Sequence, residues 1–140
     1  MIPEFRGLYK TDRSWVYGSY IHCEVYGDII KPFDSLIEYD VIPETVGQYI
    51  GLKDTTQGHA KIFVHDIVEW DDASKGEYWR RAKVICGPEG YGFEILPSSP
   101  TGTPGDIFWM ANFIYCPDTN RDGNVLRVIG SQIIYHCSSE

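Results

Sequence analysis

The chain has 140 residues, a length typical of a single domain and sufficient for a hydrophobic core without metals or disulfides. Hydrophobic residues make up 43% and charged residues 23%, a composition that excludes an intrinsically disordered chain. The formal net charge of −8 repels phosphate backbones at long range, and so it argues against general nucleic-acid binding.

No targeting or membrane-spanning segment is expected. Five charged side chains interrupt the first fourteen residues, which argues against the apolar region of a signal peptide. The longest uncharged apolar stretch, residues 107–116, is far shorter than the ~20 residues of a spanning helix. Four cysteines at irregular spacing are typical of free thiols in a reducing compartment. We therefore expect a cytoplasmic protein without membrane association.

Turn residues at short intervals divide the first half of the chain into strand patterns. Residues 5–9 and 15–25 are predicted to form two strands across a polar turn. Alternation in the second strand places four side chains on one face: Val16, Gly18, Tyr20 and His22. Residues 36–42 form a further strand pattern, which stops at Pro43 because proline cannot donate to a central ladder. Residues 46–50 follow as another strand.

The second half continues in the same way. Residues 61–70 carry the clearest strand pattern, with side chains predicted to alternate between two faces over the whole segment. Residues 78–85 and 91–96 are predicted to form a hairpin around a glycine- and proline-containing turn. Residues 106–115 fit a short helix, capped by Asp106, and a buried strand equally well.

A final strand is predicted over residues 125–135. Short strands at regular spacing with frequent turns are typical of barrels and sandwiches. The many aromatic residues, 14% of the chain, favour strands as well. We therefore predict a mainly β, barrel-like single domain over residues 1–140, with little helix.

The middle of the chain carries a family resemblance. Residues 41–54 read V-I-P-E-T-V-G-Q-Y-I-G-L-K-D, and residues 62–68 read I-F-V-H-D-I-V. Together they resemble the core of the YopX family, which has the form T-V-G-Q-y-T-G-l-k-D, a turn with Gly, and then I-y-e-G-D-I-V. The F-R and W-V-Y-G pieces near the start and V-I-G at residues 128–130 are similar to the opening and closing motifs of that family.

Three positions depart from the family pattern. Ile50 stands where the family has Thr, His65 stands where it has Gly, and Ser131-Gln132 replaces Asn. The resemblance implies a β-rich, barrel-like core and a protein encoded by a bacteriophage or prophage, acting in the cytoplasm of a bacterial host cell. It implies no established activity, so the family supplies context and not chemistry.

Two interpretations of the motif stay open. In the structural one, Asp54 is a turn residue and Asp66, at the start of an apolar strand, accepts backbone N–H bonds. In the functional one, polar residues of the motif converge on one surface. The candidate interaction surface then consists of Thr45, Gln48, Tyr49, Asp54, Asp66, Trp79 and Arg81.

Motifs for metals and catalysis are weak. Residues 118–123 read D-T-N-R-D-G, the first half of a calcium loop, but the twelfth position is Ile129 instead of Glu, which favours a plain turn. The His and Cys residues lack the spacing of structural zinc sites. No nucleophile elbow, phosphate-binding pattern or acid–base pair stands out. We therefore expect no cofactor, no metal and no enzymatic activity, and an enzyme without a recognisable motif is the third hypothesis.

Binding to another macromolecule is the remaining class of function. The many Tyr and Trp residues, and the edge strands that a β domain must cover, favour a protein-interaction module. We expect it to form a homo-oligomer or to contact an unknown phage or host protein. The alternative is a nucleic-acid-associated factor, in which Trp79, Arg81 and Lys83 share one strand face for stacking and phosphate contact. Otherwise these cations pair with nearby Asp71, Asp72 or Glu77.

Overall fold

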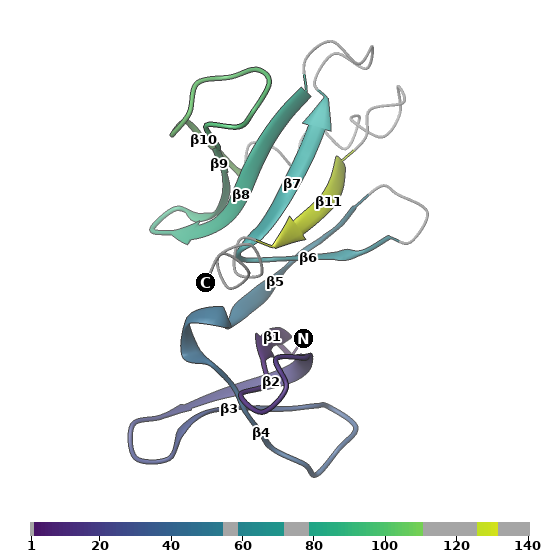
Figure 1. Ribbon diagram of the computed structural model, residues 1–140, viewed down its shortest axis with the longest axis vertical. Helices are drawn as coiled ribbons and strands as arrows, with labels where there is room; N and C mark the ends of the chain where they lie inside the picture. Colours follow the sequence, from purple (N-terminus) through teal and green to yellow (C-terminus); the bar gives the residue numbers. More distant parts are fainter. Residues whose placement is uncertain (1, 55–58, 72–78, 111–125, 132–140) are drawn as a thin grey trace. The chain divides into compact units, whose positions relative to one another are not determined.

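The computed structural model describes residues 2–54, 59–71, 79–110 and 126–131 (Figure 1). These residues are mainly β, as predicted, and no helix among them is long and apolar enough to cross a bilayer. A short 3-10 turn, η1, covers Pro43–Thr45. The strands are β1 Phe5–Leu8, β2 Trp15–Cys23, β3 Gly27–Lys31, β4 Tyr39–Asp40, β5 Gly47–Lys53, β6 Lys61–Phe63, β7 Asp66–Asp71, β8 Trp79–Gly87, β9 Gly90–Ile95, β10 Ile107–Trp109 and β11 Leu126–Ser131.

Contacts group the chain into two compact units, Met1–Tyr49 and Ile50–Glu140. In the first unit the strand order is β4-β3-β2-β1-β5, and β5 continues into the second unit, where it neighbours β6. The second unit also contains the five-stranded sheet β10-β9-β8-β7-β11. The described strands pair antiparallel in open sheets and close no barrel, so the barrel-like core stays a prediction. The single domain stays a prediction too, because two compact units can still fold together as one domain.

The core of the first unit lies on one face of β1, β2 and β3. Val16, Ile30 and Val41 are buried there, and five further side chains pack against them: Phe5, Tyr9, Tyr20, Tyr39 and Val46. The predicted face of β2 is confirmed at Val16 and Gly18, which are both buried. The strand β3 is absent from the sequence prediction. Its burial alternates, but one of the two buried positions is Asp28, so apolar and polar residue types do not alternate along the sequence.

The strand predicted over residues 36–42 is wrong at its start. Only Tyr39–Asp40 pairs as β4, with an isolated bridge from Val41 to Tyr9. Residues 36 and 37 are exposed instead. The hydroxyl of Ser35 accepts a hydrogen bond from the backbone N–H of Ile37 at 2.9 Å, and this local turn occupies the backbone that a ladder would need.

The segment 61–70 is two strands, β6 and β7, and not the single strand predicted. A turn at Val64 and His65 separates them, and His65 has a positive φ of 82°. The expected alternation therefore fails across the turn, since Ile62 and Phe63 are both buried. Within β7 it holds, because Val68 and Trp70 belong to the core while Ile67 and Glu69 point to the other face.

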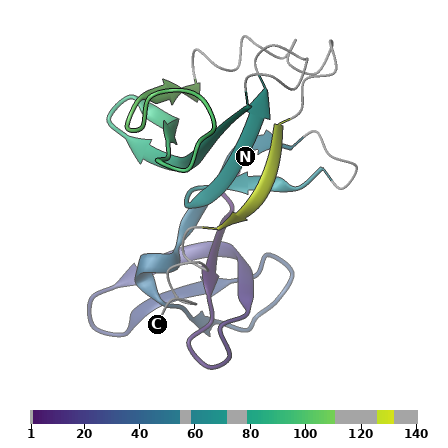
Figure 2. The same ribbon diagram turned by 45° about the horizontal axis from the view of Figure 1, so that its top comes forward.

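In the five-stranded sheet of the second unit, β11, drawn in yellow in Figure 2, lies beside β7, and β8, β9 and β10 follow on the other side of β7. The predicted hairpin is confirmed as β8 and β9, which meet at the pair Gly87 and Gly90. Gly90 has a φ of 105°, a conformation that side chains disfavour. Residues packed from β5 to β11 form one core: Ile50, Ile62, Val68, Trp70, Ala82, Val84, Phe93, Ile95 and Leu126.

The remaining predictions are settled only where the structure describes the chain. Of residues 106–115, Ile107–Trp109 forms the strand β10 against β9, and positions 111–115 lie outside the described residues. The predicted last strand is confirmed as β11 over Leu126–Ser131. Residues 118–123, the half-matched calcium loop, also lie outside the described part.

Candidate functional site

The predicted interaction residues are divided between the two units. Thr45, Gln48 and Tyr49 belong to the first unit, and Asp54, Asp66, Trp79 and Arg81 belong to the second. A common surface for all seven therefore stays a prediction, and each unit is considered by itself.

In the first unit, Thr45 joins η1 to β1. Its Oγ1 accepts a hydrogen bond from the backbone N–H of Leu8 at 2.9 Å and donates one to the carbonyl oxygen of Ile42 at 2.6 Å. Gln48 lies opposite Phe5 in the pairing of β5 with β1. The backbone of Tyr49 donates to the carbonyl of Glu4 at 2.8 Å. These contacts hold strands together, which supports the structural interpretation of this part of the motif.

In the second unit, both motif carboxylates are buried and accept backbone N–H groups. Asp54 accepts at one oxygen from Ala60 at 3.0 Å and at the other from Val128 in β11 at 3.3 Å. Asp66 accepts from Phe63 at 2.8 Å across the turn between β6 and β7. The backbone N–H bond expected of Asp66 is present, and the bonds of Asp54 support the structural interpretation as well. Asp54 thus links Ala60 to β11, and Asp66 closes the turn between β6 and β7.

A row of three charged side chains crosses the face of the five-stranded sheet that points away from the core. Glu69 in β7 lies directly opposite Arg81 in β8 and Arg127 in β11, and we call these three residues the charge row. Arg81 donates from Nε and Nη2 to Oε2 of Glu69, at 2.9 and 2.7 Å. Arg127 donates from Nε and Nη2 to Oε1, at 3.1 and 2.8 Å. One carboxylate therefore binds two guanidinium groups.

Electrostatics keep Glu69 ionised in this position. Burial alone raises the pKa of its carboxyl, since the side chain is only 9% exposed. The hydrogen bonds and positive charges of Arg81 and Arg127 outweigh burial and lower the pKa below its ordinary value. The row carries two cations and one anion, so it has a local excess of positive charge on an acidic protein.

The sequence analysis expected Trp79, Arg81 and Lys83 on one face, and the register of β8 is consistent with that. Each of them has a neighbour there. The guanidinium of Arg127 lies 4.5 Å from the centre of the Trp79 ring. Lys83 pairs with Glu94 of β9 at 3.7 Å. Arg81 pairs with Glu69, which the sequence analysis missed because only the strand register brings these residues together.

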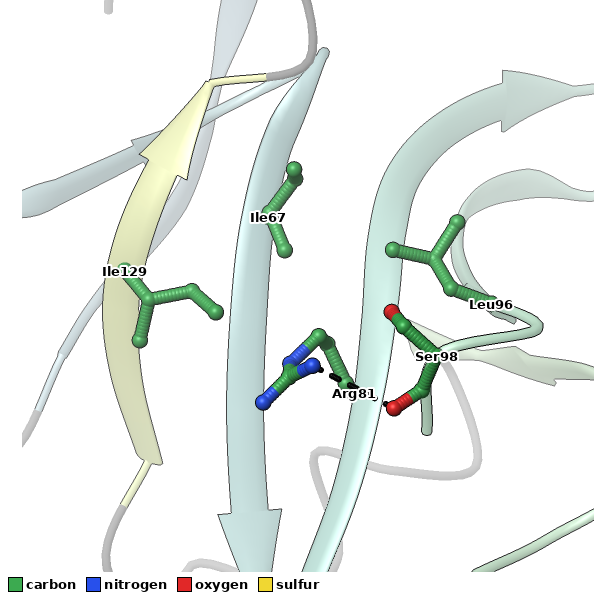
Figure 3. A pocket seen from close by; sticks show the side chains of 5 residues that line it. All are labelled: Ile67, Arg81, Leu96, Ser98 and Ile129. Carbon is green, nitrogen blue, oxygen red and sulfur yellow. Dashed lines mark hydrogen bonds between the residues drawn. The ribbon is translucent and has the colours of Figure 1, made fainter. Parts of the chain in front are cut away.

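A pocket of about 440 Å³ adjoins the charge row (Figure 3). Among the described residues, five from four segments line it: Ile67, Arg81, Leu96, Ser98 and Ile129. The segment after β9 is fixed to β8 by a backbone bond from Leu96 to Arg81 and by a bond from the N–H of Arg81 to the hydroxyl of Ser99. In Figure 3 the Arg81 guanidinium reaches the carbonyl of Ser98, at 3.2 Å.

A second polar cluster lies in the first unit, where β2 pairs with β3. Asp28 accepts a hydrogen bond from the hydroxyl of Tyr20 and contacts Nδ1 of His22, each at 2.6 Å. The Tyr20 bond outweighs burial and, with His22 and Lys10, lowers the pKa of Asp28. Burial, followed by the neighbouring Asp28, raises the pKa of Tyr20 to about 12. The cluster fixes the orientation of a half-exposed imidazole, an arrangement that also supports metal ligands and bases.

Metal ligands do not gather around that imidazole or elsewhere in the described ranges, where no group of three or more His, Cys, Asp or Glu side chains is placed to hold an ion. Cys23 and Cys86 are free thiols in different units. The other two cysteines fall outside the part of the chain that the structure describes.

Large hydrophobic side chains are exposed mostly in the first unit. Of the eleven such side chains among the described residues, eight lie in this unit, and seven of those fall between positions 17 and 37. We call these seven the exposed apolar set: Tyr17, Ile21, Val25, Tyr26, Phe33, Leu36 and Ile37. They come from β2, from the turn between β2 and β3, and from the connection to β4.

No family model, no curated protein and no solved structure matches the chain.

Proposed function

We propose that this protein is a non-enzymatic interaction module that self-associates through the exposed apolar set of its first unit. The carrying observation is the concentration of exposed apolar side chains between positions 17 and 37. Single exposed hydrophobics are ordinary on a soluble domain, but an accumulation of them in one small unit is typical of surfaces that are covered by a partner. Tyr, Phe and aliphatic residues are also those that fill the buried centre of interfaces.

A second copy of the chain is the partner that we favour. Most soluble oligomers are symmetric homo-oligomers, in which one surface covers its own copy. An unknown phage or host protein that covers the same side chains is the other form of this proposal.

The proposal includes the origin and the compartment that the YopX resemblance implies: a phage or prophage protein with a barrel-like core, working in the bacterial cytoplasm. Backbone geometry supports the resemblance at two glycine positions of the family pattern. Gly51 has a φ of 87° with open space where a side chain would begin, and His65, in place of the family's Gly, has a φ of 82°. Both conformations favour glycine.

Sedimentation velocity of the full chain tests self-association. At about 100 μM, above the Kd of even a weak micromolar dimer, we expect the wild-type protein to sediment as a dimer or a larger oligomer. Leu36→Lys, at a side chain 94% exposed and thus outside any core, and Ile21→Lys are expected to give monomers. Ile107→Lys is the matched control, because Ile107 is an exposed apolar residue of the other unit. A monomeric wild type, or equal effects of all three variants, would contradict the proposal.

The nucleic-acid alternative depends on Trp79, Arg81 and Lys83. The contacts around them weigh against it, because each cation lies beside a carboxylate, Arg81 beside Glu69 and Lys83 beside Glu94, and Arg127 lies over the Trp79 ring. A gel shift at about 50 mM salt, where phosphate contacts are strongest, tests it directly. A shift that Arg81→Ala abolishes would favour this alternative over the interaction module.

A further inference from the structure

The pocket beside the charge row has the composition of a small-ligand site. Its volume of about 440 Å³ falls within the range of about 300–1,000 Å³ that ligand pockets occupy. Three aliphatic side chains, Ile67, Leu96 and Ile129, form most of its wall, and Arg81 supplies one charged group (Figure 3). An apolar wall with one well-placed polar group is the usual pattern of such sites.

Arg81 has hydrogen-bonding capacity left for a ligand. A guanidinium carries five N–H donors. Three are used here, from Nε and Nη2 to Glu69 and from Nη1 to the carbonyl of Ser98. One N–H on Nη1 and one on Nη2 therefore have no acceptor among the described residues. Glu69 holds the planar group in place, so its ordering is complete before a ligand arrives.

The charges of the residues beside the pocket, and of the protein as a whole, indicate which charge a ligand carries. Arg81 and Arg127 face the single carboxylate of Glu69, which leaves one excess positive charge beside the pocket. The protein as a whole carries −8, so a polyanion is repelled at long range. A ligand with one negative charge and an apolar body satisfies both conditions.

We propose that this pocket binds a monocarboxylate on an aliphatic body, with the carboxylate on Arg81 and the aliphatic part against Ile67, Leu96 and Ile129. Two sources share this chemistry, a fatty carboxylate and the free C-terminus of a polypeptide that ends in an aliphatic residue. Planar guanidinium groups bind carboxylates through paired, charge-assisted hydrogen bonds. Every residue in this site belongs to the second unit, so the site is independent of the exposed apolar set and of self-association.

Nuclear magnetic resonance titration of the full ¹⁵N-labelled chain tests the proposal. The probes are octanoate and N-acetyl-leucine, with octanamide and N-acetyl-leucinamide as neutral counterparts. The readout is the side-chain Nε–Hε signal of Arg81 together with the backbone signals of Ile67 and Ile129. We expect a saturable shift with a carboxylate and binding about tenfold weaker, or worse, with its amide, because a charge-assisted hydrogen bond is lost.

Three variants locate the binding. Arg81→Gln is expected to abolish it, whereas Lys83→Gln, which removes a neighbouring cation of the same strand, is expected to change affinity by less than about twofold. Ile129→Glu leaves the Arg81–Glu69 pair intact and places a competing carboxylate in the pocket, so it is expected to abolish binding as well. Ile129 is 36% exposed, and the folded state therefore tolerates this charge.

The titrations distinguish a fatty carboxylate from a polypeptide C-terminus, and they can also overturn the proposal. Tighter binding of octanoate assigns the fatty carboxylate, and tighter binding of N-acetyl-leucine assigns the polypeptide C-terminus. The proposal is overturned if neither carboxylate moves the Arg81 signal, if the amides bind equally well, or if Lys83→Gln weakens binding as much as Arg81→Gln does. Sedimentation of the same samples reports separately on self-association.

Discussion

Replacing Glu69 with glutamine tests whether the charge row stabilises the second unit. The substitution keeps the shape of the side chain and removes its negative charge. Arg81 and Arg127 then face each other across β7 without a neutralising carboxylate, and the new amide offers its oxygen to one guanidinium group and its N–H donors to the other.

The expected loss in the free energy of unfolding depends on how deeply Glu69 is buried and on how many hydrogen bonds it accepts. Removing one partner of a fully buried ion pair costs about 3–5 kcal/mol. Here Glu69 is 9% exposed, but Arg81 is 32% and Arg127 is 44% exposed, so water compensates both cations in part. We therefore expect Glu69→Gln to lower the free energy of unfolding by about 2 kcal/mol.

Urea denaturation followed by tryptophan fluorescence measures this loss, because Trp70, Trp79 and Trp109 all lie in the second unit. With a urea dependence of about 2 kcal/mol per molar, the midpoint is expected to fall by about 1 M. The matched control is Glu94→Gln, since Glu94 pairs with Lys83 at 3.7 Å on the same face and is itself 32% exposed. That pair is a surface pair, so the control is expected to cost less than about 0.5 kcal/mol.

Equal effects of Glu69→Gln and Glu94→Gln would refute a stabilising role of the charge row.

A second comparison concerns Arg127. In the wild-type background Arg127→Gln removes two hydrogen bonds to Glu69 and is expected to cost about 1 kcal/mol. Added to Glu69→Gln it is expected to cost nothing further or to restore stability, because it relieves the repulsion between the cations. Additive losses would show that the three side chains do not act together.

Three further predictions concern backbone conformation and acid stability. Gly18→Ala places a methyl group against the backbone carbonyl of Lys31 and is expected to lower the free energy of unfolding by about 3 kcal/mol. Gly27→Ala, in open space at a φ of 86°, is expected to lower it by about 1 kcal/mol. Equal urea midpoints of the two variants would contradict the steric argument. His65→Gly relieves a positive φ and is expected to raise the free energy of unfolding by up to about 1 kcal/mol. His65→Val introduces a β-branched side chain at that φ and is expected to lower it. The reverse order of the two urea midpoints would contradict this explanation. The pKa of Asp28 is lower in the folded state, so its contribution to stability is present above the ordinary aspartate pKa of about 3.9 and is lost as pH falls through the lower folded value. Asp28→Asn is therefore expected to reduce the change of the urea midpoint with pH between about pH 5 and pH 2. The same pH dependence in the variant and the wild type would disprove this assignment.

Local signals predicted those parts of the fold that depend on neighbouring residues. The hairpin of β8 and β9 follows from its turn, where Gly90 adopts a φ that other residues avoid. The acceptor role of Asp66 follows from its place at the start of an apolar strand, since a carboxylate there accepts nearby backbone N–H groups. Both features act over a few positions of the chain, so one sequence is sufficient to find them.

The failures arise where a local pattern was ambiguous or where a distant contact decided the result. Histidine at position 65 hides a turn, because nothing in that residue type signals a positive φ. The strand β3 was missed since its buried Asp28 is satisfied only by Tyr20 and His22 of the paired strand. Of the candidate site residues, Arg81 was found but its partner Glu69 was not.

The sequence by itself determined that the chain is mainly β and where most strands and one hairpin lie. These properties depend on the alternation of side chains and on turn residues, which act along the chain. Only the tertiary structure decided that Glu69 lies between Arg81 and Arg127, which are 12 and 58 positions away, and that a pocket forms beside them. The physical reason is strand register, because a shift by one residue would turn every one of these side chains to the opposite face of the sheet.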